Sequence, residues 1–141
     1  MVLEEQGVLV VDDDPVRRRR IAQILADENF AVTAVAEGLA ALRAASGRRF
    51  ALIVAGLHLP GSLDGVATVR QARARQPWLK ALLIDGRGRR PDLDDCDSDD
   101  LITTPIERWE LIGCVFELLQ RAPAADTADL ARRARTRRYA S

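Results

Sequence analysis

The stretch VLVVDDDP, residues 8–15, carries the strongest structural signal in the sequence. Four consecutive apolar residues are typical of a short strand that is buried on both faces of a parallel sheet. The aspartates that follow end this strand. Asp14-Pro15 is typical of a helix start, with the carboxylate as N-cap and the proline at the first helical position. The stretch therefore predicts a strand that leads directly into a helix.

The same alternation of strand and helix continues along the chain. Runs of apolar or β-branched residues predict further strands at residues 31–36, 50–57, 81–84 and 101–103. Helical spacing and capping signals predict helices over residues 15–28, 39–45, 64–76 and 106–119. Strands that alternate with helices at this spacing indicate an α/β fold, in which helices cover both faces of a parallel sheet.

The last of these helices has an apolar face whose most prominent member is Trp109. This side chain either belongs to the core or contacts a protein partner. The predicted face consists of Ile106, Trp109, Ile112, Val115, Phe116 and Leu119.

A helix is expected between the fourth and fifth strands, but the residues there do not favour one. The segment from Gly86 to Asp100 contains a second glycine, a proline and six aspartates, and its only sizeable aliphatic residue is Leu93. A helix formed here would have almost no apolar face to bury. We therefore expect this helix to be short or absent.

Composition excludes several classes of protein. The 141 residues include 21 basic and 21 acidic side chains, so the chain as a whole has no net attraction for nucleic acid. No apolar stretch approaches the length of roughly 18 residues that suggests a membrane span. Cys96 and Cys114 have no metal-ligand spacing and are expected to be free thiols in a reducing compartment. These features predict a cytoplasmic protein with one domain.

Candidate functional residues follow the predicted strands. In open parallel sheets a ligand binds beyond the carboxyl ends of the strands, near the point where the strand order reverses. Asp12 and Asp13 follow the first strand, Gly56 ends the third, Asp85 follows the fourth and Thr104 follows the fifth. We expect these residues to meet at one edge of the sheet.

Three motifs at these strand ends resemble the receiver domains of bacterial two-component response regulators. VLVVDDDP at 8–15 is similar to their first strand and acid pair. LHLPG at 57–61, followed by Asp64-Gly65, is similar to their phosphorylation-site loop. Thr104-Pro105 is similar to their Lys-Pro element, in which the proline is cis. The resemblance covers residues 6–121. It implies a flavodoxin-like, doubly wound sheet of five strands in the order 2-1-3-4-5, followed by a basic tail over 122–141.

The departures from the family pattern concern the residues that handle phosphate. Gly56 stands where the family has its phosphoacceptor aspartate, Asp85 where it has Thr or Ser, and Thr104 where it has lysine. Leu101 takes the place of the aromatic switch residue. Glycine offers no nucleophile, threonine supplies no charge, and an aspartate repels a phosphoryl group. The resemblance therefore implies an atypical, stand-alone receiver that is not an enzyme and signals through protein contacts without phosphorylation at this site. Its expected partner is a histidine kinase or a downstream regulator.

Asp12, Asp13 and Asp85 could still hold a cation. Convergent carboxylates repel one another, which either raises a pKa or recruits a metal, and oxygen ligands favour Mg²⁺. Alternatively, Asp85 points to solvent and the acid pair only ends a strand. His58 is expected on the solvent-facing rim of the site.

Two further functions remain open at this point. One is residual metal-dependent phosphotransfer with Asp85 as a surrogate acceptor. The other is nucleic-acid binding by the arginine-rich tail, which contains Arg132, Arg133, Arg135, Arg137 and Arg138. Basic termini are usually solvated, and a nucleic-acid partner is therefore not the expected one.

Overall fold

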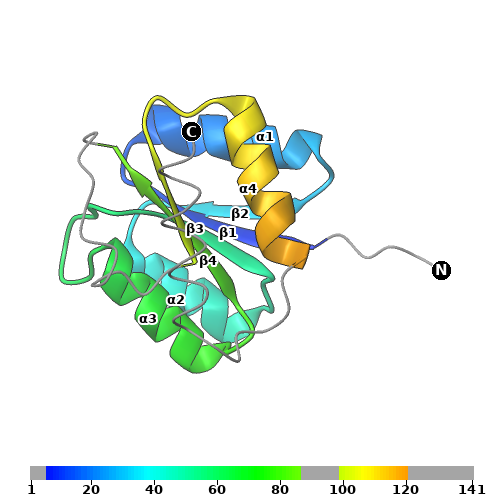
Figure 1. Ribbon diagram of the computed structural model, residues 1–141. Coiled ribbons are helices and arrows are strands. Elements are labelled where there is room, and N and C mark those ends of the chain that lie inside the picture. The colour runs from blue at the N-terminus through cyan, green and yellow to red at the C-terminus, as the bar shows by residue number, and fades with distance from the viewer. Residues whose placement is uncertain (1–5, 87–98, 121–141) are drawn as a thin grey trace.

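The computed structural model describes residues 6–86 and 99–120. Within these residues, five parallel strands form one sheet in the order β2-β1-β3-β4-β5 (Figure 1). The strands are β1 (Gly7–Val11), β2 (Ala31–Val35), β3 (Leu52–Gly56), β4 (Lys80–Asp85) and β5 (Asp100–Thr103). The predicted fold class and strand order are confirmed.

The described part of the chain has four helices, and they cover both faces of the sheet. They are α1 (Pro15–Asp27), α2 (Gly38–Gly47), α3 (Gly65–Arg75) and α4 (Arg108–Gln120). Helices α1 and α4 lie on one face, and α2 and α3 lie on the other (Figure 1).

The apolar strands contribute side chains to two separate hydrophobic cores, one on each face of the sheet. Side chains alternate between the faces of a strand. In β1, Val8 and Val10 accordingly pack with the α1 and α4 side, whereas Leu9 and Val11 pack with the α2 and α3 side. All four are fully buried. The unbroken apolar run of β1 is thus explained by helices on both of its faces.

Helix α1 begins as the sequence predicts. The Asp14 carboxylate accepts hydrogen bonds from the backbone N–H groups of Val16 (2.9 Å) and Arg17 (3.3 Å), and Pro15 occupies the first turn. This cap fixes where α1 starts relative to the end of β1. It thereby places the first turn of α1, including Arg17, directly over the loop that carries the acid pair.

Helix α3 begins unusually close to the end of β3. A Cβ atom at Gly65 would lie 2.1 Å from the carbonyl oxygen of Gly56, so only glycine fits there without a backbone shift. The Asp64 side chain caps the helix by accepting from the Ala67 N–H at 2.8 Å. The Asp64-Gly65 pair therefore draws α3 against the carboxyl edge of the sheet.

The predicted apolar face of α4 is rotated by about one residue. Leu111, Cys114, Val115 and Leu118 are the buried residues, whereas Trp109 is 73% exposed and Phe116 is 42% exposed. Of the two alternatives for Trp109, a place in the core is therefore wrong, and contact with a protein partner stays a prediction. The helix carries two overlapping apolar stripes of similar spacing, and packing against β4 and α1, rather than local pattern, selects between them.

Some predictions fall on residues that the structure does not describe. The short or absent helix was predicted for a segment of which residues 87–98 lie outside the described ranges, as does the tail over 122–141. Cys96 also lies outside them, while Cys114 is buried. No helix in the described ranges is long and apolar enough to span a membrane.

Candidate functional site

The carboxyl edge of the sheet brings the candidate residues together. Strand β3 lies between β1 and β4, with Gly56 paired to Ile84, and β5 pairs with β4 so that Asp85 lies opposite Thr103. The ladder continues past the strand ends, because the Thr104 N–H donates to the Asp85 carbonyl at 3.1 Å. Asp12, Gly56, Asp85 and Thr104 therefore follow neighbouring strands at one edge, as predicted.

Gly56 occupies a position that has room for a side chain. A Cβ atom there would lie 3.4 Å from Leu59 Cδ2 and 3.7 Å from Asp12 Cγ, both ordinary van der Waals contacts. A carboxylate at this position would stand beside the Asp12 carboxylate. With glycine present, this central position offers no nucleophile.

The Thr104-Pro105 peptide bond is cis, which matches the family element. The Thr104 hydroxyl lies 3.5 Å from the Asp85 carbonyl oxygen, at the limit of a hydrogen bond. Threonine carries no charge, so this position contributes no countercharge to the acids of the site.

Arg17 supplies the positive charge instead. Its Nε donates to Asp12 Oδ2 at 2.5 Å, and its Nη2 donates to Asp12 Oδ1 at 2.8 Å. The Asp12 side chain is 1% exposed, and that of Arg17 is 20% exposed. The hydrogen bond to Asp12 raises the pKa of Arg17, the negative charges of Asp12, Asp14 and Asp13 add to this, and burial opposes it.

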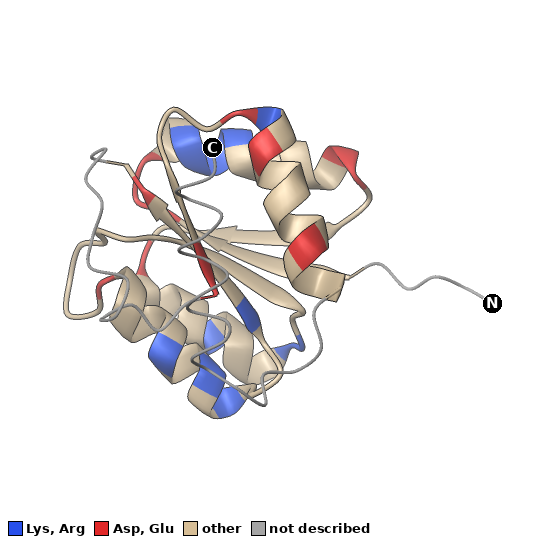
Figure 2. Cartoon of the chain, in the orientation of Figure 1, with Lys and Arg blue, Asp and Glu red and all other residues tan. Residues whose placement is uncertain are grey.

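The other two aspartates of the loop lie at longer range from the same guanidinium. Arg17 Nη1 is 3.7 Å from Asp14 Oδ2, and Arg17 Nη2 is 4.0 Å from Asp13 Oδ1. Both carboxylates are nearly half exposed. Figure 2 shows the acidic loop between β1 and α1 beside the basic first half of α1. One arginine thus faces three carboxylates.

Asp85 is fully buried, so the alternative in which it points to solvent is wrong. Its Oδ1 lies 3.8 Å from Nε2 of His58, which is 39% exposed. The predicted rim position of His58 is therefore correct in exposure, but its ring also approaches a buried acid that the sequence did not connect with it. A buried carboxylate at the end of β4 is poorly placed to meet a phosphodonor from solvent.

A small pocket of about 220 Å³ lies at this edge of the sheet and is lined by Asp13, Asp14, Arg17, Leu57, His58, Ile84 and Gly86. Magnesium does not fit the donor set of this pocket. Both oxygens of Asp12 already accept hydrogen bonds from Arg17, and no carboxylate is present at position 56. In the described ranges, no three His, Cys, Asp or Glu side chains are placed to hold a metal ion. The expected metal group of Asp12, Asp13 and Asp85 is therefore not formed.

Arg17 is the functional residue that sequence reasoning missed. The arginine run at 17–20 was visible, and so was the helix start at Asp14-Pro15. A residue three positions after an N-cap lies in the first turn, above the preceding loop. That spacing was the available signal, but which of four arginines turns toward the acids depends on tertiary packing.

A parallel five-stranded sheet with an acid pair after β1 and a Thr–cis-Pro step after β5 defines a receiver-type α/β domain. The match to known proteins gives the same result, because residues 8–115 match the family described as the response regulator receiver domain. The chain belongs to this family.

Relatives and solved structures agree with this assignment. The chain is similar to the transcriptional regulatory protein TcrA of Mycobacterium tuberculosis, with 31% identity over 82% of this chain and 47% of TcrA. It is also similar to the protein PetR of Rhodobacter capsulatus, with 34% identity over 86% and 52% of the two chains. The chain thus spans about half the length of the curated relatives it matches.

Two solved structures share the fold over their whole length. The receiver domain of the sensor histidine kinase PA1611 from Pseudomonas aeruginosa superposes with a TM-score of 0.74 and 27% identity, covering 84% of this chain and 100% of that one. That protein was crystallised with magnesium coordinated in its active-site cleft. A receiver protein from Sinorhizobium medicae gives a TM-score of 0.73 and 28% identity, covering 84% and 97% of the two chains.

Proposed function

We propose that this chain is a cytoplasmic, non-enzymatic receiver domain that signals through protein contacts and is not switched by phosphorylation at the usual site. The observation that carries the proposal is Gly56. It ends β3 beside Asp12, because a Cβ atom there would lie 3.7 Å from Asp12 Cγ, and the chain supplies no carboxylate at this position. Thr104 and Asp85 support it, because neither can stabilise an incoming phosphoryl group as lysine and a hydroxyl would.

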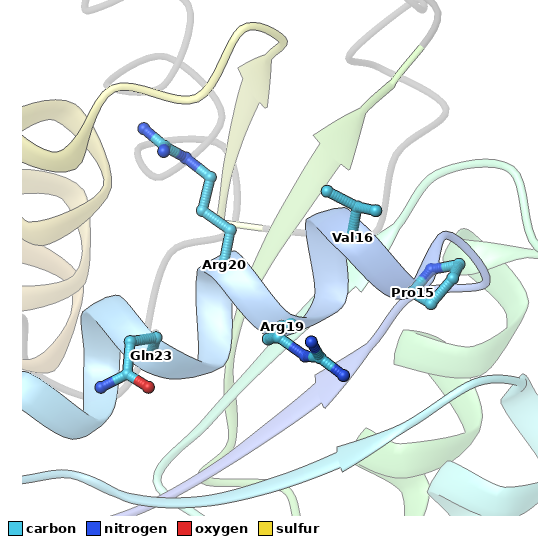
Figure 3. Close-up of a pocket in the computed structure, with 5 residues that line it drawn as sticks. All are labelled: Pro15, Val16, Arg19, Arg20 and Gln23. Atoms are coloured by element: carbon cyan, nitrogen blue, oxygen red, sulfur yellow. The ribbon is translucent and has the colours of Figure 1, made fainter.

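The surface available to a partner lies on the α1 and α4 side. Trp109 on α4 and Val16 on α1 are 73% and 77% exposed. A hollow of about 380 Å³ lies along α1 and is lined by Pro15, Val16, Arg19, Arg20 and Gln23 (Figure 3). Arg20 donates to the Ile106 carbonyl at 2.9 Å and thereby connects this hollow to the loop before α4. The exposed Trp109 and the basic side chains that line the hollow would suit a protein partner with an acidic, partly apolar segment.

The experiment is incubation of the whole chain with acetyl phosphate and magnesium, followed by intact mass measurement and peptide mapping. We expect no stoichiometric phosphoryl mass increase. A phosphoryl group mapped to Asp85 or Asp13 would overturn the proposal and would favour surrogate phosphotransfer. A related receiver with its acceptor aspartate serves as the positive control for the reagent.

A further inference from the structure

The pairing of Arg17 with Asp12 has the geometry of a built contact rather than a chance surface ion pair. Two N–H groups of one planar guanidinium meet the two oxygens of one buried carboxylate, at 2.5 and 2.8 Å. Such bidentate pairs are among the strongest and most directional polar contacts in proteins. Asp12 also accepts from the Asp14 N–H at 2.9 Å, so its carboxylate is held from both sides.

Gly86 provides the space in which the guanidinium lies. A Cβ atom at this position would be 2.4 Å from Arg17 Nη1 and 2.8 Å from Arg17 Cζ. Any side chain at residue 86 would therefore have to displace the end of Arg17. The location of Arg17 thus depends on two separate features, the start of α1 at Pro15 and the absence of a side chain after β4.

The guanidinium occupies the coordination sphere that a cation at Asp12 would need. Magnesium binds oxygen ligands at about 2.0–2.1 Å in a near-octahedral arrangement. Both Asp12 oxygens are covered by N–H groups, and the remaining charge of Arg17 faces Asp13 and Asp14. A divalent ion could reach Asp12 only by displacing Arg17.

We propose that Arg17 is a tethered cation that replaces a divalent metal ion on Asp12 and closes this pocket to magnesium. The acid loop is then neutralised by the chain itself, whatever the magnesium concentration. This inference goes beyond the proposed function, because it concerns Asp12 and Arg17 and is independent of the missing acceptor at Gly56. A receiver could lack its acceptor and still bind magnesium at its acid pair.

The test is a magnesium titration of the whole chain that is monitored by ¹H–¹⁵N NMR. Mn²⁺ serves as a paramagnetic probe of the loop at residues 12–14. We expect Arg17→Gln to bind magnesium at least about tenfold more tightly than the unmodified chain, with broadening by Mn²⁺ centred on residues 12–14. Arg73→Gln is the matched control, because it removes an arginine from another buried Arg–Asp pair. Arg19→Gln controls for the loss of one exposed charge on α1.

A second variant displaces Arg17 without removing its charge. Gly86→Ala forces the guanidinium to move, and we expect a smaller gain in magnesium affinity, again absent from the controls. In the unmodified chain, the Arg17 Nε–H resonance should not move on magnesium addition. This last measurement does not require any variant to fold.

The inference is overturned if the unmodified chain binds magnesium as tightly as Arg17→Gln, or if its Arg17 Nε–H resonance shifts as magnesium is added. It is equally overturned if a folded Arg17→Gln protein shows no magnesium binding above that of Arg73→Gln. If the unmodified chain takes up no phosphoryl group but binds magnesium at Asp12, the proposed function stands and this inference fails. The two proposals are therefore tested separately.

Discussion

Two Arg–Asp pairs with the same shortest separation lie at opposite edges of the sheet. Arg17 and Asp12 join at 2.5 Å at the carboxyl edge, with side-chain exposures of 20% and 1%. Arg73 and Asp99 join at 2.5 Å at the amino edge, before β5, with exposures of 22% and 6%. Both pairs join a partly exposed guanidinium to a buried carboxylate, and they differ in the groups around them.

The Arg73–Asp99 pair is enclosed by backbone. Arg73 Nε also donates to the Leu79 carbonyl at 3.0 Å, and Asp99 also accepts from the Ala81 N–H at 3.0 Å. The pair therefore fastens the end of α3 to the starts of β4 and β5. The Arg17–Asp12 pair instead borders a pocket that contains Asp13, Asp14 and His58. A buried Arg–Asp pair can therefore stabilise the fold at one edge of the sheet and occupy a site at the other.

The largest expected effect is the return of phosphorylation. Gly56→Asp, Asp85→Thr and Thr104→Lys together should restore uptake from acetyl phosphate by more than the sum of the single changes, because groups that act as one unit are non-additive. Gly56→Asp alone would place another carboxylate beside Asp12 with no added countercharge, which raises carboxylate pKa values and weakens the nucleophile. Phosphoryl incorporation is measured by intact mass over time.

This triple variant should respond differently to the loss of Arg17 and to the loss of Arg73. Adding Arg17→Gln should raise the rate of incorporation by about tenfold, equivalent to about 1.4 kcal/mol, because magnesium gains access to Asp12. Adding Arg73→Gln should leave the rate unchanged. If Gly56→Asp alone suffices, the pocket has kept more of its chemistry than we propose. If the folded triple variant takes up nothing even with Arg17→Gln, the assignment of these strand ends to a phosphotransfer pocket is wrong.

Loss of stability is the next effect in size. Removing one partner of a buried ion pair leaves the other charge uncompensated, and we expect Arg73→Gln to cost about 3 kcal/mol. Arg17→Gln should cost less, about 2 kcal/mol, because pocket water can reach Asp12 once the guanidinium is gone. Urea unfolding followed by circular dichroism measures both, and Arg19→Gln should change stability by less than about 0.5 kcal/mol. If the three Arg→Gln variants lose the same free energy of unfolding, the two buried pairs do not differ from an exposed arginine, and the prediction is wrong.

A smaller effect, the gain in stability when magnesium is added, should distinguish the two Arg–Asp pairs most clearly. A ligand that binds only the folded state stabilises it by RT ln(1 + [L]/Kd). At a magnesium concentration about tenfold above Kd, Arg17→Gln should regain about 1.4 kcal/mol. Arg73→Gln and the unmodified chain should gain nothing beyond the general effect of salt, which a matched sodium chloride series corrects. Recovery of both variants to the same extent would show that magnesium acts nonspecifically.

Much of the fold, but only part of the site, could be predicted from the sequence. The five strands and the Asp14 and Asp64 caps follow from local signals, whereas the strand order follows from the resemblance to receiver domains, and the structure confirms all of them. The Arg17 contact, the burial of Asp85 and the apolar face of α4 depend on how side chains pack between elements. A pattern of spacing does not decide between neighbouring rotamers or between two overlapping apolar stripes.

The smallest predicted effect concerns Glu110 on α4, an acid whose main charged neighbour is another acid rather than an arginine. Burial raises the pKa of Glu110, and the negative charge of Glu107 raises it further. Because the folded-state pKa lies above the unfolded one, the charged form is disfavoured by folding, and stability should fall as pH rises above the ordinary pKa of a glutamate, about 4.3. The Glu110 side chain is only half-buried, so after solvent screening the effect should be only a few tenths of a kcal/mol. Unfolding measured at a series of pH values should therefore show the stability of Glu110→Gln rising relative to that of the unmodified chain as pH increases.

Glu107→Gln removes only the second cause of the raised Glu110 pKa, and it should show part of the same trend. A pH-independent difference between Glu110→Gln and the unmodified chain would contradict the prediction, and would mean that this half-buried acid needs no countercharge of the kind that Asp12 and Asp99 receive.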